Sequence, residues 1–238
     1  MHDELTVIVP VFNEEESLPQ FFTAMDSFLA QSPVPTAVLL VNDGSTDNSL
    51  SLMRKKCSVH SAYRTLSLNT NCGLSSAIKA GIDHSTTSLT GYIDADLQTD
   101  PMDFLLYFEH FPAYDMVNGI RSKRQDSFIK RISSKIANNY RRLMINDKIT
   151  DTCCPLKIIK TEYARKIPFF DGMHRFLPAL VQLEGGQVKQ LPISHFPRMA
   201  GTSKYHLLNR IIGPFFDTLA FRWMRSRYIR YSVTNDNS

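Results

Sequence analysis

Residues 5–30, "LTVIVPVFNEEESLPQFFTAMDSFLA", decide the fold of this chain. The first eight are apolar and rich in β-branched side chains, which is typical of a strand buried on both faces of a parallel sheet. The run ends at Asn13, and three glutamates follow near the start of the next segment, where a helix dipole favours them. From there apolar residues recur at helical spacing: Leu18, Phe21, Phe22, Met25, Phe28 and Leu29. The stretch therefore predicts a buried strand followed by an amphipathic helix.

The same alternation continues through the first half of the chain. Further strands are expected at 36–43, 63–69 and 89–96, and further helices at 44–57 and 72–84. Regular alternation of strand and helix is the pattern of right-handed βαβ units. We therefore predict an α/β fold with a mostly parallel, Rossmann-like sheet and helices on both faces.

The second half of the chain alternates less regularly. "YDMVNGIR", residues 114–121, predicts a fifth strand, and residues 128–145 predict a helix with interspersed Lys and Arg. "QVKQLPISHFP", residues 187–197, predicts a late strand, whose prolines suit the edge of a sheet. We expect one domain over residues 1–205 and a C-terminal extension over residues 206–238.

Charge is divided unequally along the 238 residues, a length that suits one large α/β domain with a short appendage. Residues 1–120 hold 5 Lys and Arg against 15 Asp and Glu, and residues 121–238 hold 22 against 8. The halves therefore carry net charges of −10 and +14. This split indicates that acids gather around one feature while bases face an anionic partner.

Several classes of protein do not fit the sequence. No apolar run approaches the roughly 18 residues of a spanning helix. The N-terminus is acidic where a signal peptide would be basic. We therefore expect a cytoplasmic protein, peripheral to the inner face of the membrane. The cysteines lack metal-site spacing and are expected to be reduced packing residues: Cys57, Cys72, Cys153 and Cys154.

Polar clusters follow each of the first four predicted strands, at 13–16, 42–47, 69–73 and 94–98. In open parallel sheets ligands bind outside the carboxyl ends of the strands. These four clusters are therefore expected to line one polar crevice.

The last of these clusters lies in "GYIDADLQTDP", residues 91–101. In an extended segment, side chains two residues apart share a face, so Asp94, Asp96 and Gln98 are predicted to point the same way. Three oxygen-bearing side chains form a partial site for Mg²⁺ or Mn²⁺, which substrate phosphates and water would complete. The alternative is that both aspartates are solvated turn residues. Asp100 is expected only to cap the next helix, ahead of Pro101.

Four motifs in order carry a resemblance to a known family: "VIVPVFNEEESLP", "LLVNDGSTDNS", "NCGLSSAIKAG" and "YIDADLQTDP". Together they resemble family 2 glycosyltransferases of the GT-A fold, which transfer sugars from nucleoside diphosphates. More narrowly, the chain resembles the dolichyl- and polyprenyl-phosphate sugar synthases. The similarity covers roughly residues 5–205.

The resemblance implies roles for particular residues. It implies that Pro10, Phe12, Glu14 and Asp43 contact the nucleotide, and that Asp94, Asp96 and Gln98 bind the metal ion. It implies an acceptor-phosphate site at Arg121, Arg131 and Ser134, and a basic loop over the diphosphate at Arg198 and Lys204. Asp94, Asp96, Arg121 and Arg131 would then be the catalytic set.

Two parts of the chain leave their roles open. The family's Asp-x-x-x-Gly-Phe stretch appears as "DTCCPLK", residues 151–157, so the role of Asp151 is undecided. His174 and Arg175 open a helix that family members place beside the acceptor. Each is as consistent with a structural role as with a functional one.

The resemblance implies an inverting, metal-dependent glycosyltransferase that moves a sugar from a UDP- or GDP-sugar to a polyprenyl phosphate, and the chemistry of the residues agrees with it. A lipid phosphate is already anionic, so it needs cations rather than a general base. The first alternative is a transferase acting on a saccharide hydroxyl, and the second is a non-catalytic membrane scaffold. No nucleic-acid partner is expected, and a homo-oligomer is left open.

The C-terminal stretch, residues 206–231, combines apolar and aromatic residues with five arginines. This composition is typical of a helix lying among lipid headgroups, with Pro214 starting or kinking a segment. The alternative is a helix that packs on the domain or in a dimer. By resemblance, the chain is similar to the subset of the family that lacks a membrane anchor.

Overall fold

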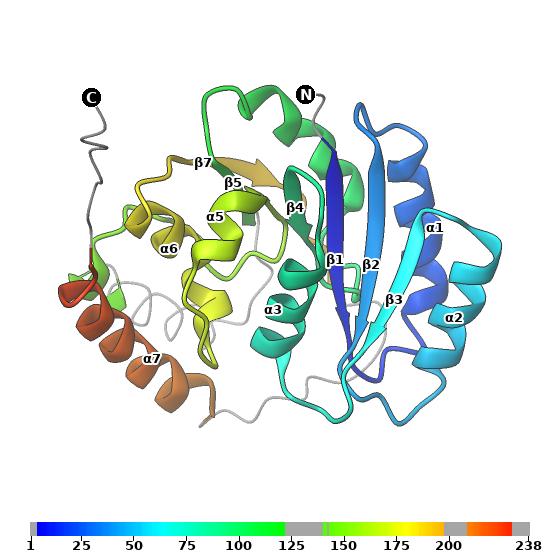
Figure 1. The fold of residues 1–238 in the computed structure, drawn as a ribbon, viewed down its shortest axis with the longest axis horizontal. Coiled ribbons are helices and arrows are strands. Elements are labelled where there is room, and N and C mark those ends of the chain that lie inside the picture. Colours follow the sequence, from blue (N-terminus) through cyan, green and yellow to red (C-terminus); the bar gives the residue numbers. More distant parts are fainter. Residues whose placement is uncertain (1–3, 122–139, 142, 198–208, 230–238) are drawn as a thin grey trace, which may run out of the picture.

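The computed structural model describes residues 4–121, 140–141, 143–197 and 209–229 (Figure 1). Four residues with predicted roles lie outside these ranges: Arg131, Ser134, Arg198 and Lys204.

The described strands form one seven-stranded sheet in the order β3-β2-β1-β4-β6-β5-β7. The strands are β1 (Leu5–Val11), β2 (Thr36–Asn42), β3 (Tyr63–Ser67), β4 (Leu89–Tyr92), β5 (Met116–Arg121), β6 (Lys157–Lys160) and β7 (Val188–Ile193). All pairs are parallel except those that β6 makes with β4 and β5. The predicted fold class is confirmed, and β7 lies at an edge as its prolines predicted.

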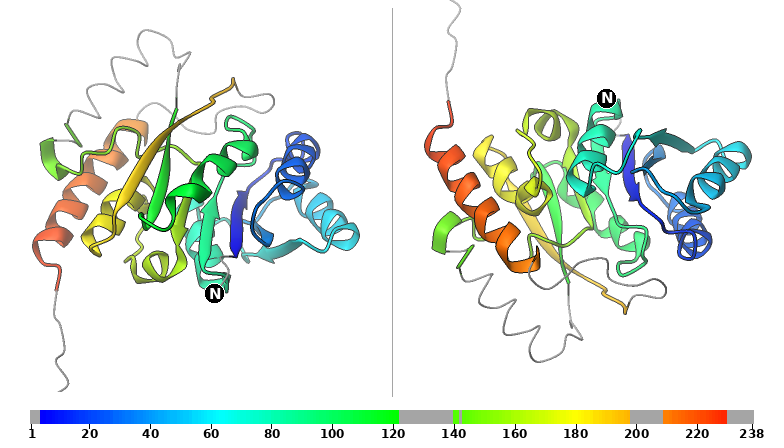
Figure 2. Two further views of the ribbon diagram at one scale, coloured as in Figure 1. Left: turned by 90° about the horizontal axis from the view of Figure 1, so that it is seen from above. Right: turned by 90° about the horizontal axis from the view of Figure 1, so that it is seen from below.

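Helices cover both faces of this sheet, as the two views in Figure 2 show. The α-helices are α1 (Leu18–Leu29), α2 (Ser49–Val59), α3 (Leu74–His84), α5 (Thr161–Lys166), α6 (Leu177–Leu183) and α7 (Asn209–Ser226). Two 3₁₀ helices, η1 (Pro101–His110) and η2 (Met173–Phe176), also lie in the described part of the chain, and residues 140–141 and 143–145 are helical. Within the described residues, no helix has the length and apolarity needed to cross a membrane.

Successive side chains of β1 point to opposite faces of the sheet and pack into two separate hydrophobic cores. Leu5, Val7 and Val9 pack with residues of α1, α2 and η1 on one face. Ile8 packs on the other face with residues of α3 and α6 and with Phe221 of α7. The near-continuous apolar sequence of β1 therefore arises because the strand is buried on both sides.

Strand β6 was not among the expected strands. It has only four residues, "KIIK", which is too short for a period of two to be recognised. It inserts antiparallel between β4 and β5 and buries Lys157 completely. Because the segment begins with a lysine, the hydrophobic pattern of the sequence does not indicate a buried strand there.

The segment after β4 was predicted to be extended, and this prediction was wrong. The strand ends at Tyr92, and the chain turns through the following residues, with Leu97 at φ 55°. A residue in the left-handed conformation interrupts the extended backbone. The side chains of Asp94, Asp96 and Gln98 therefore do not follow the alternation that predicted one shared face. Asp100 does cap η1 as predicted, because its carboxylate accepts a hydrogen bond from the Met102 amide at 2.9 Å.

Candidate active site

The loops that follow β1 and β2 are joined by reciprocal hydrogen bonds. The Asn13 amide donates to Ser45 Oγ at 3.1 Å, and Asn13 Oδ1 accepts from the Thr46 amide at 2.8 Å. The Glu15 amide donates to Asp47 Oδ2 at 3.1 Å. The glutamates therefore precede α1 and help to build this double loop, whereas the sequence suggested that they lie at the start of the helix.

The residues expected to contact the nucleotide lie together at the carboxyl end of β1. Pro10, Phe12 and Glu14 are all partly exposed there. Glu14 Oε2 accepts a hydrogen bond from Ser17 Oγ at 2.8 Å, which orients the carboxylate. Their contact with a nucleotide stays a prediction.

Asp43, at the end of β2, is buried by the loop that precedes α3. Its carboxylate accepts hydrogen bonds from the amides of Cys72 at 2.7 Å and Gly73 at 2.9 Å, and from Asn71 Nδ2 at 3.2 Å. Gly44 permits the close approach of this loop, because a Cβ there would lie 2.5 Å from the Asn71 nitrogen. In the structure Asp43 thus fixes the loop that precedes α3, and its predicted contact with base or ribose stays a prediction.

The acidic turn holds two mutually repelling carboxylates. Asp94 Oδ1 accepts from Tyr92 Oη at 2.6 Å, and Asp96 Oδ1 accepts from the Gln98 amide at 3.1 Å. Burial and then the charge of Asp96 raise the pKa of Asp94 to about 6, against the opposing effects of Tyr92, Lys157 and Arg121. A divalent cation would relieve this repulsion.

The donor set fits a hard cation only as a partial site. Within the described ranges, no group of three or more His, Cys, Asp and Glu residues is placed to hold a metal ion. Two carboxylates with additional oxygens from substrate phosphate and water are the usual environment of Mg²⁺. Gln98 lies in the same turn, and its carbonyl accepts from the Phe196 amide at 3.0 Å.

Arg121, at the end of β5, is held by Asp151. The guanidinium makes two hydrogen bonds of 2.8 Å to the two carboxylate oxygens, and the Arg121 amide adds a third at 3.2 Å. Burial opposes the charge, but the hydrogen bonds and charge of Asp151 raise the pKa of Arg121 above its ordinary value. The residue expected at the acceptor phosphate is therefore a fixed cation, and its electrostatic effect reaches Asp94.

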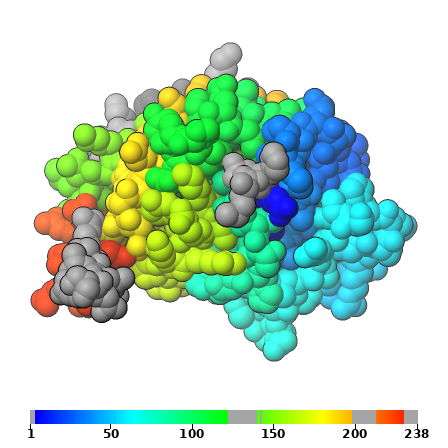
Figure 3. Space-filling model, turned by 45° about the horizontal axis from the view of Figure 1, so that its top comes forward, coloured from blue at the N-terminus to red at the C-terminus, as the bar shows by residue number. Residues whose placement is uncertain are grey.

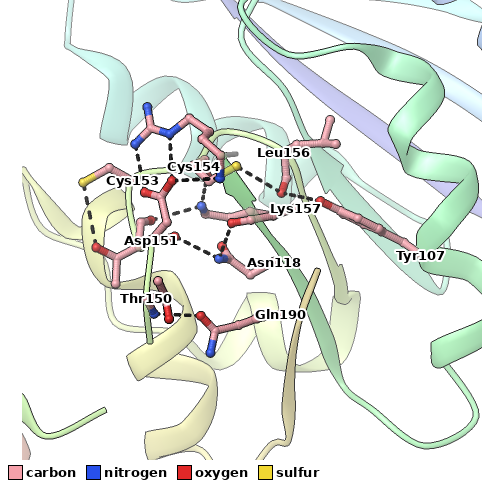
Figure 4. Close-up of polar contacts among 12 residues, drawn as sticks. Tyr107, Asn118, Thr150, Asp151, Cys153, Cys154, Leu156, Lys157 and Gln190 are labelled. Carbon is pink, nitrogen blue, oxygen red and sulfur yellow. Dashed lines mark hydrogen bonds and ion pairs between the residues drawn. The ribbon is translucent and has the colours of Figure 1, made fainter. Parts of the chain in front are cut away.

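The turn that carries Asp151 is supported from below by two buried polar residues that the sequence analysis missed (Figure 4). Lys157 Nζ donates to the carbonyl oxygens of Thr152, at 3.1 Å, and of Cys154. Asn118 Nδ2 donates to the carbonyl oxygen of Asp151 at 2.9 Å. The available signal was a polar residue beside apolar ones, Asn118 in "MVNGIR" and Lys157 in "KIIK". Burial lowers the pKa of Lys157, with the neighbouring thiols and Asp151 opposing.

His174 and Arg175 point to different neighbours. The His174 ring bonds Ser75 of α3, with 2.7 Å between Nδ1 and Oγ. Arg175 Nη1 donates to Asp217 of α7 at 2.9 Å. The short helix η2 is therefore connected both to the crevice wall and to the C-terminal helix.

Residues 6–168 match the sequence pattern of glycosyl transferase family 2, and this span includes every described site residue up to Lys157. The chain belongs to glycosyl transferase family 2. The resemblance inferred from the four motifs is confirmed, and so is the expectation of a glycosyltransferase.

Among curated relatives of this family 2 glycosyltransferase is dodecaprenyl-phosphate galacturonate synthase from Rhizobium johnstonii (strain DSM 114642 / LMG 32736 / 3841). It is 32% identical over 208 residues, which cover 85% of this chain and 62% of the relative. The chain therefore spans less than two thirds of that relative's length.

Solved structures with the same fold confirm the GT-A architecture. Glucosyl-3-phosphoglycerate synthase from Mycobacterium tuberculosis is 14% identical with a TM-score of 0.71, covering 97% of this chain and 82% of that one. Mannosyl-3-phosphoglycerate synthase from Rubrobacter xylanophilus is 15% identical with a TM-score of 0.72, covering 100% and 79%. At such identities the likeness concerns the fold alone.

Proposed function

We propose that this family 2 glycosyltransferase transfers a sugar from a UDP- or GDP-sugar to a polyprenyl phosphate, with inversion at the anomeric carbon. One observation carries the proposal. Both carboxylate oxygens of Asp151 accept hydrogen bonds from Arg121. Asp151 therefore acts as the counter-ion of a fixed cation and is poorly placed to accept a proton.

A saccharide hydroxyl and a phosphate make different demands on the protein, because the first acceptor needs a free base and the second needs a fixed cation. A saccharide hydroxyl must lose a proton during transfer, which requires a positioned base with a pKa near neutrality. A phosphate monoester is anionic at neutral pH and needs to be held in line with the anomeric carbon. Arg121, with a planar guanidinium oriented by Asp151, suits the second task. The relative named as a dodecaprenyl-phosphate galacturonate synthase supports the same acceptor class.

Asp94 and Asp96 would hold the Mg²⁺ or Mn²⁺ ion, with Gln98 as the third predicted ligand. When bound, such an ion neutralises charge that develops on a departing diphosphate. One solved structure of the Mycobacterium tuberculosis synthase contains Mn²⁺ and UDP-glucose, and a Pyrobaculum calidifontis mannosyltransferase structure contains Mn²⁺ and GDP-mannose. These relatives support a nucleotide-sugar donor and a divalent ion for this chain.

We further propose that the enzyme works on the cytoplasmic face of a membrane, which it contacts through α7. Large apolar side chains are exposed on this helix: Phe215, Phe216, Leu219 and Trp223. Arg222, Arg225 and Arg227 are exposed on the same helix or directly after it. Apolar residues edged by arginines favour an interfacial position beside anionic lipid.

The test is to incubate the full chain with a polyprenyl phosphate in detergent and a panel of labelled UDP- and GDP-sugars, with Mn²⁺ or Mg²⁺. We expect one donor to give a lipid-linked monosaccharide, and EDTA to abolish its formation. Transfer to a saccharide hydroxyl in place of the lipid would support the first alternative. Absence of transfer and of nucleotide-sugar binding with every donor would overturn the proposed function.

A further inference from the structure

His174 is held in one orientation by a buried serine. Ser75 lies in the first turn of α3 and is buried, and its Oγ lies 2.7 Å from His174 Nδ1. The same Oγ accepts a hydrogen bond from the Gly172 amide at 3.0 Å. Ser75 therefore fixes both the His174 ring and the backbone at Gly172.

These two contacts favour one tautomer of the His174 ring, the one in which the buried Ser75 hydroxyl also finds an acceptor for its own proton. Ser75 Oγ already accepts from Gly172, and among the described residues His174 Nδ1 is the acceptor available for its hydroxyl proton. Nδ1 is thus an acceptor, and a neutral imidazole with Nδ1 as acceptor carries its hydrogen on Nε2. The ring presents a donor on its outer side.

That outer side is accessible. His174 is only partly buried, and within the described residues Nε2 makes no hydrogen bond and is not among the buried polar atoms without a partner. A polar ring atom that lacks a protein partner and reaches solvent can bind a substrate.

The ring is linked to the nucleotide side of the candidate active site through Ser75. Ser75 is two residues beyond Gly73, whose amide is held by Asp43 on the nucleotide side. On the other side, the charge of Lys157, which supports the Asp151 turn, acts on both His174 and Asp94. The metal pair Asp94 and Asp96 is expected at the diphosphate of the nucleotide, and Arg121 at the acceptor phosphate.

We propose that His174 donates a hydrogen bond from Nε2 to a phosphate oxygen of a bound substrate, with Ser75 and Gly172 fixing the tautomer that allows it. This inference rests on the proposed function, because it assigns His174 to phosphate binding. The phosphate belongs either to the polyprenyl phosphate or to the nucleoside diphosphate. In either case His174 is a donor, since Nδ1 is occupied and Nε2 already carries hydrogen.

The charges around the ring agree with a neutral donor. Burial, followed by the charges of Arg175 on η2 and Lys157 on β6, lowers the pKa of His174 to about 3. Asp217 of α7 accepts a hydrogen bond from Arg175, whose positive charge offsets the effect of the Asp217 carboxylate on the pKa of His174. An imidazolium at this place would repel the cations that hold the turn.

The first experiment observes the tautomer directly in the full chain. Imidazole ¹⁵N resonances are recorded by NMR from pH 5 to pH 8, with His174→Asn used to assign the His174 signals. We expect a neutral ring with hydrogen on Nε2 across this range. Hydrogen on Nδ1, or protonation with a midpoint near the ordinary value of about 6.5, would overturn the proposal.

Two probes then distinguish the sources of the phosphate. Farnesyl phosphate is added in one arm, and UDP or GDP with Mg²⁺ in the other. We expect one arm to shift the Nε2 signal, and that arm identifies the phosphate bound. No shift with any probe, under conditions where binding is seen by calorimetry, overturns the proposal without affecting the proposed function.

Kinetics provide a readout that a structural role would not change. His174→Phe keeps a ring of similar size without the donor, whereas His174→Gln keeps an amide donor. We expect His174→Phe to raise the KM of the contacted substrate about 10- to 100-fold, with little change in the other KM, and His174→Gln to restore most of it. Equal kinetics for wild type and both variants, all with unchanged melting temperature, contradicts the proposal. If wild type transfers no sugar, the proposed function fails and the NMR experiment still decides the role of His174.

Discussion

Asp151 can be tested as the residue that orients Arg121. We expect Asp151→Asn to lower transfer about 10- to 100-fold, because the guanidinium loses its charged partner and its fixed direction. The free energy of unfolding should fall by about 1–3 kcal/mol, because a largely buried arginine is left without its counter-ion. Steady-state kinetics and urea denaturation measure the two effects.

The matched control is Asp115→Asn. Asp115 pairs with Lys160 at 2.8 Å, next to the amino end of β5 and so away from the crevice. We expect a smaller loss of stability and unchanged transfer. If Asp115→Asn lowers transfer as much as Asp151→Asn, loss of stability alone explains both results and the orienting role is excluded.

Asp94 should make the metal-free protein less stable at high pH. Its folded pKa of about 6 exceeds the ordinary value of 3.8, so the protonated form favours the folded state. The stabilisation is complete below about pH 4 and is lost as the pH rises through about 6. In EDTA at pH 8, Asp94→Asn should therefore raise the free energy of unfolding by about 3 kcal/mol, while lowering metal-dependent transfer about 100-fold or more.

The control is to repeat the comparison of wild type and Asp94→Asn at pH 4. At pH 4 wild type and Asp94→Asn should unfold at nearly the same denaturant concentration, because both side chains are then neutral. An equal difference at pH 4 and pH 8 would mean that packing or the Tyr92 hydrogen bond, and not charge repulsion, produces the effect.

At the scale of elements, the contact between α3 and β1 depends on Gly81. A Cβ there would lie 2.5 Å from Ile8 Cγ2, on a fully buried, β-branched side chain. We expect Gly81→Ala to lower the free energy of unfolding by about 1–3 kcal/mol, since overpacking outweighs the helix propensity of alanine. Gly213→Ala in α7 is the control, because no atom of the described residues lies within 4 Å of its Cβ position. Chemical denaturation of both variants should give opposite signs; equal destabilisation would contradict the packing argument.

How far the sequence predicts the elements depends on their length and chemistry. The strands β1, β2 and β4 were predicted because each begins an apolar-rich run that is followed by a polar cluster, and β3 because it continues the alternation of strand and helix. β6 was missed because it is short and begins with Lys157, and hydrophobic pattern does not detect a lysine that bonds backbone carbonyls. The turn after β4 was missed because Leu97 adopts a left-handed conformation that leucine rarely takes.

The roles of polar residues were harder to predict than their positions. Asp43 was placed at the crevice from its strand and Arg121 was assigned to the acceptor phosphate by resemblance, but their partners come from distant segments: the 71–73 loop and Asp151. Pairing between distant residues is set by tertiary packing, which a single sequence does not specify. The pairing of Arg121 with Asp151 therefore could not be foreseen, although it now carries the argument for a phosphate acceptor.

For the molecule as a whole, α7 lies at the end opposite α2 (Figure 3). It packs on the domain through Thr218 and Phe221, and the Phe221 ring stacks on Phe176 with centroids 5.3 Å apart. It also exposes Phe216 and Trp223. Truncation before α7 would uncover part of a core, so surface substitutions are the sharper test of membrane contact.

The only tryptophan of the chain, Trp223, reports on that contact. It is 67% exposed, so we expect its emission to shift to the blue when anionic phospholipid vesicles are added, and to return as salt is raised. Phe216→Ser should weaken vesicle binding about tenfold, because a 62% exposed ring no longer enters the lipid. Val59→Ser is the matched control, since Val59 is 75% exposed on α2 at the opposite end. Equal weakening by both substitutions, or an unshifted emission with saturating vesicles, would show that α7 does not face the membrane.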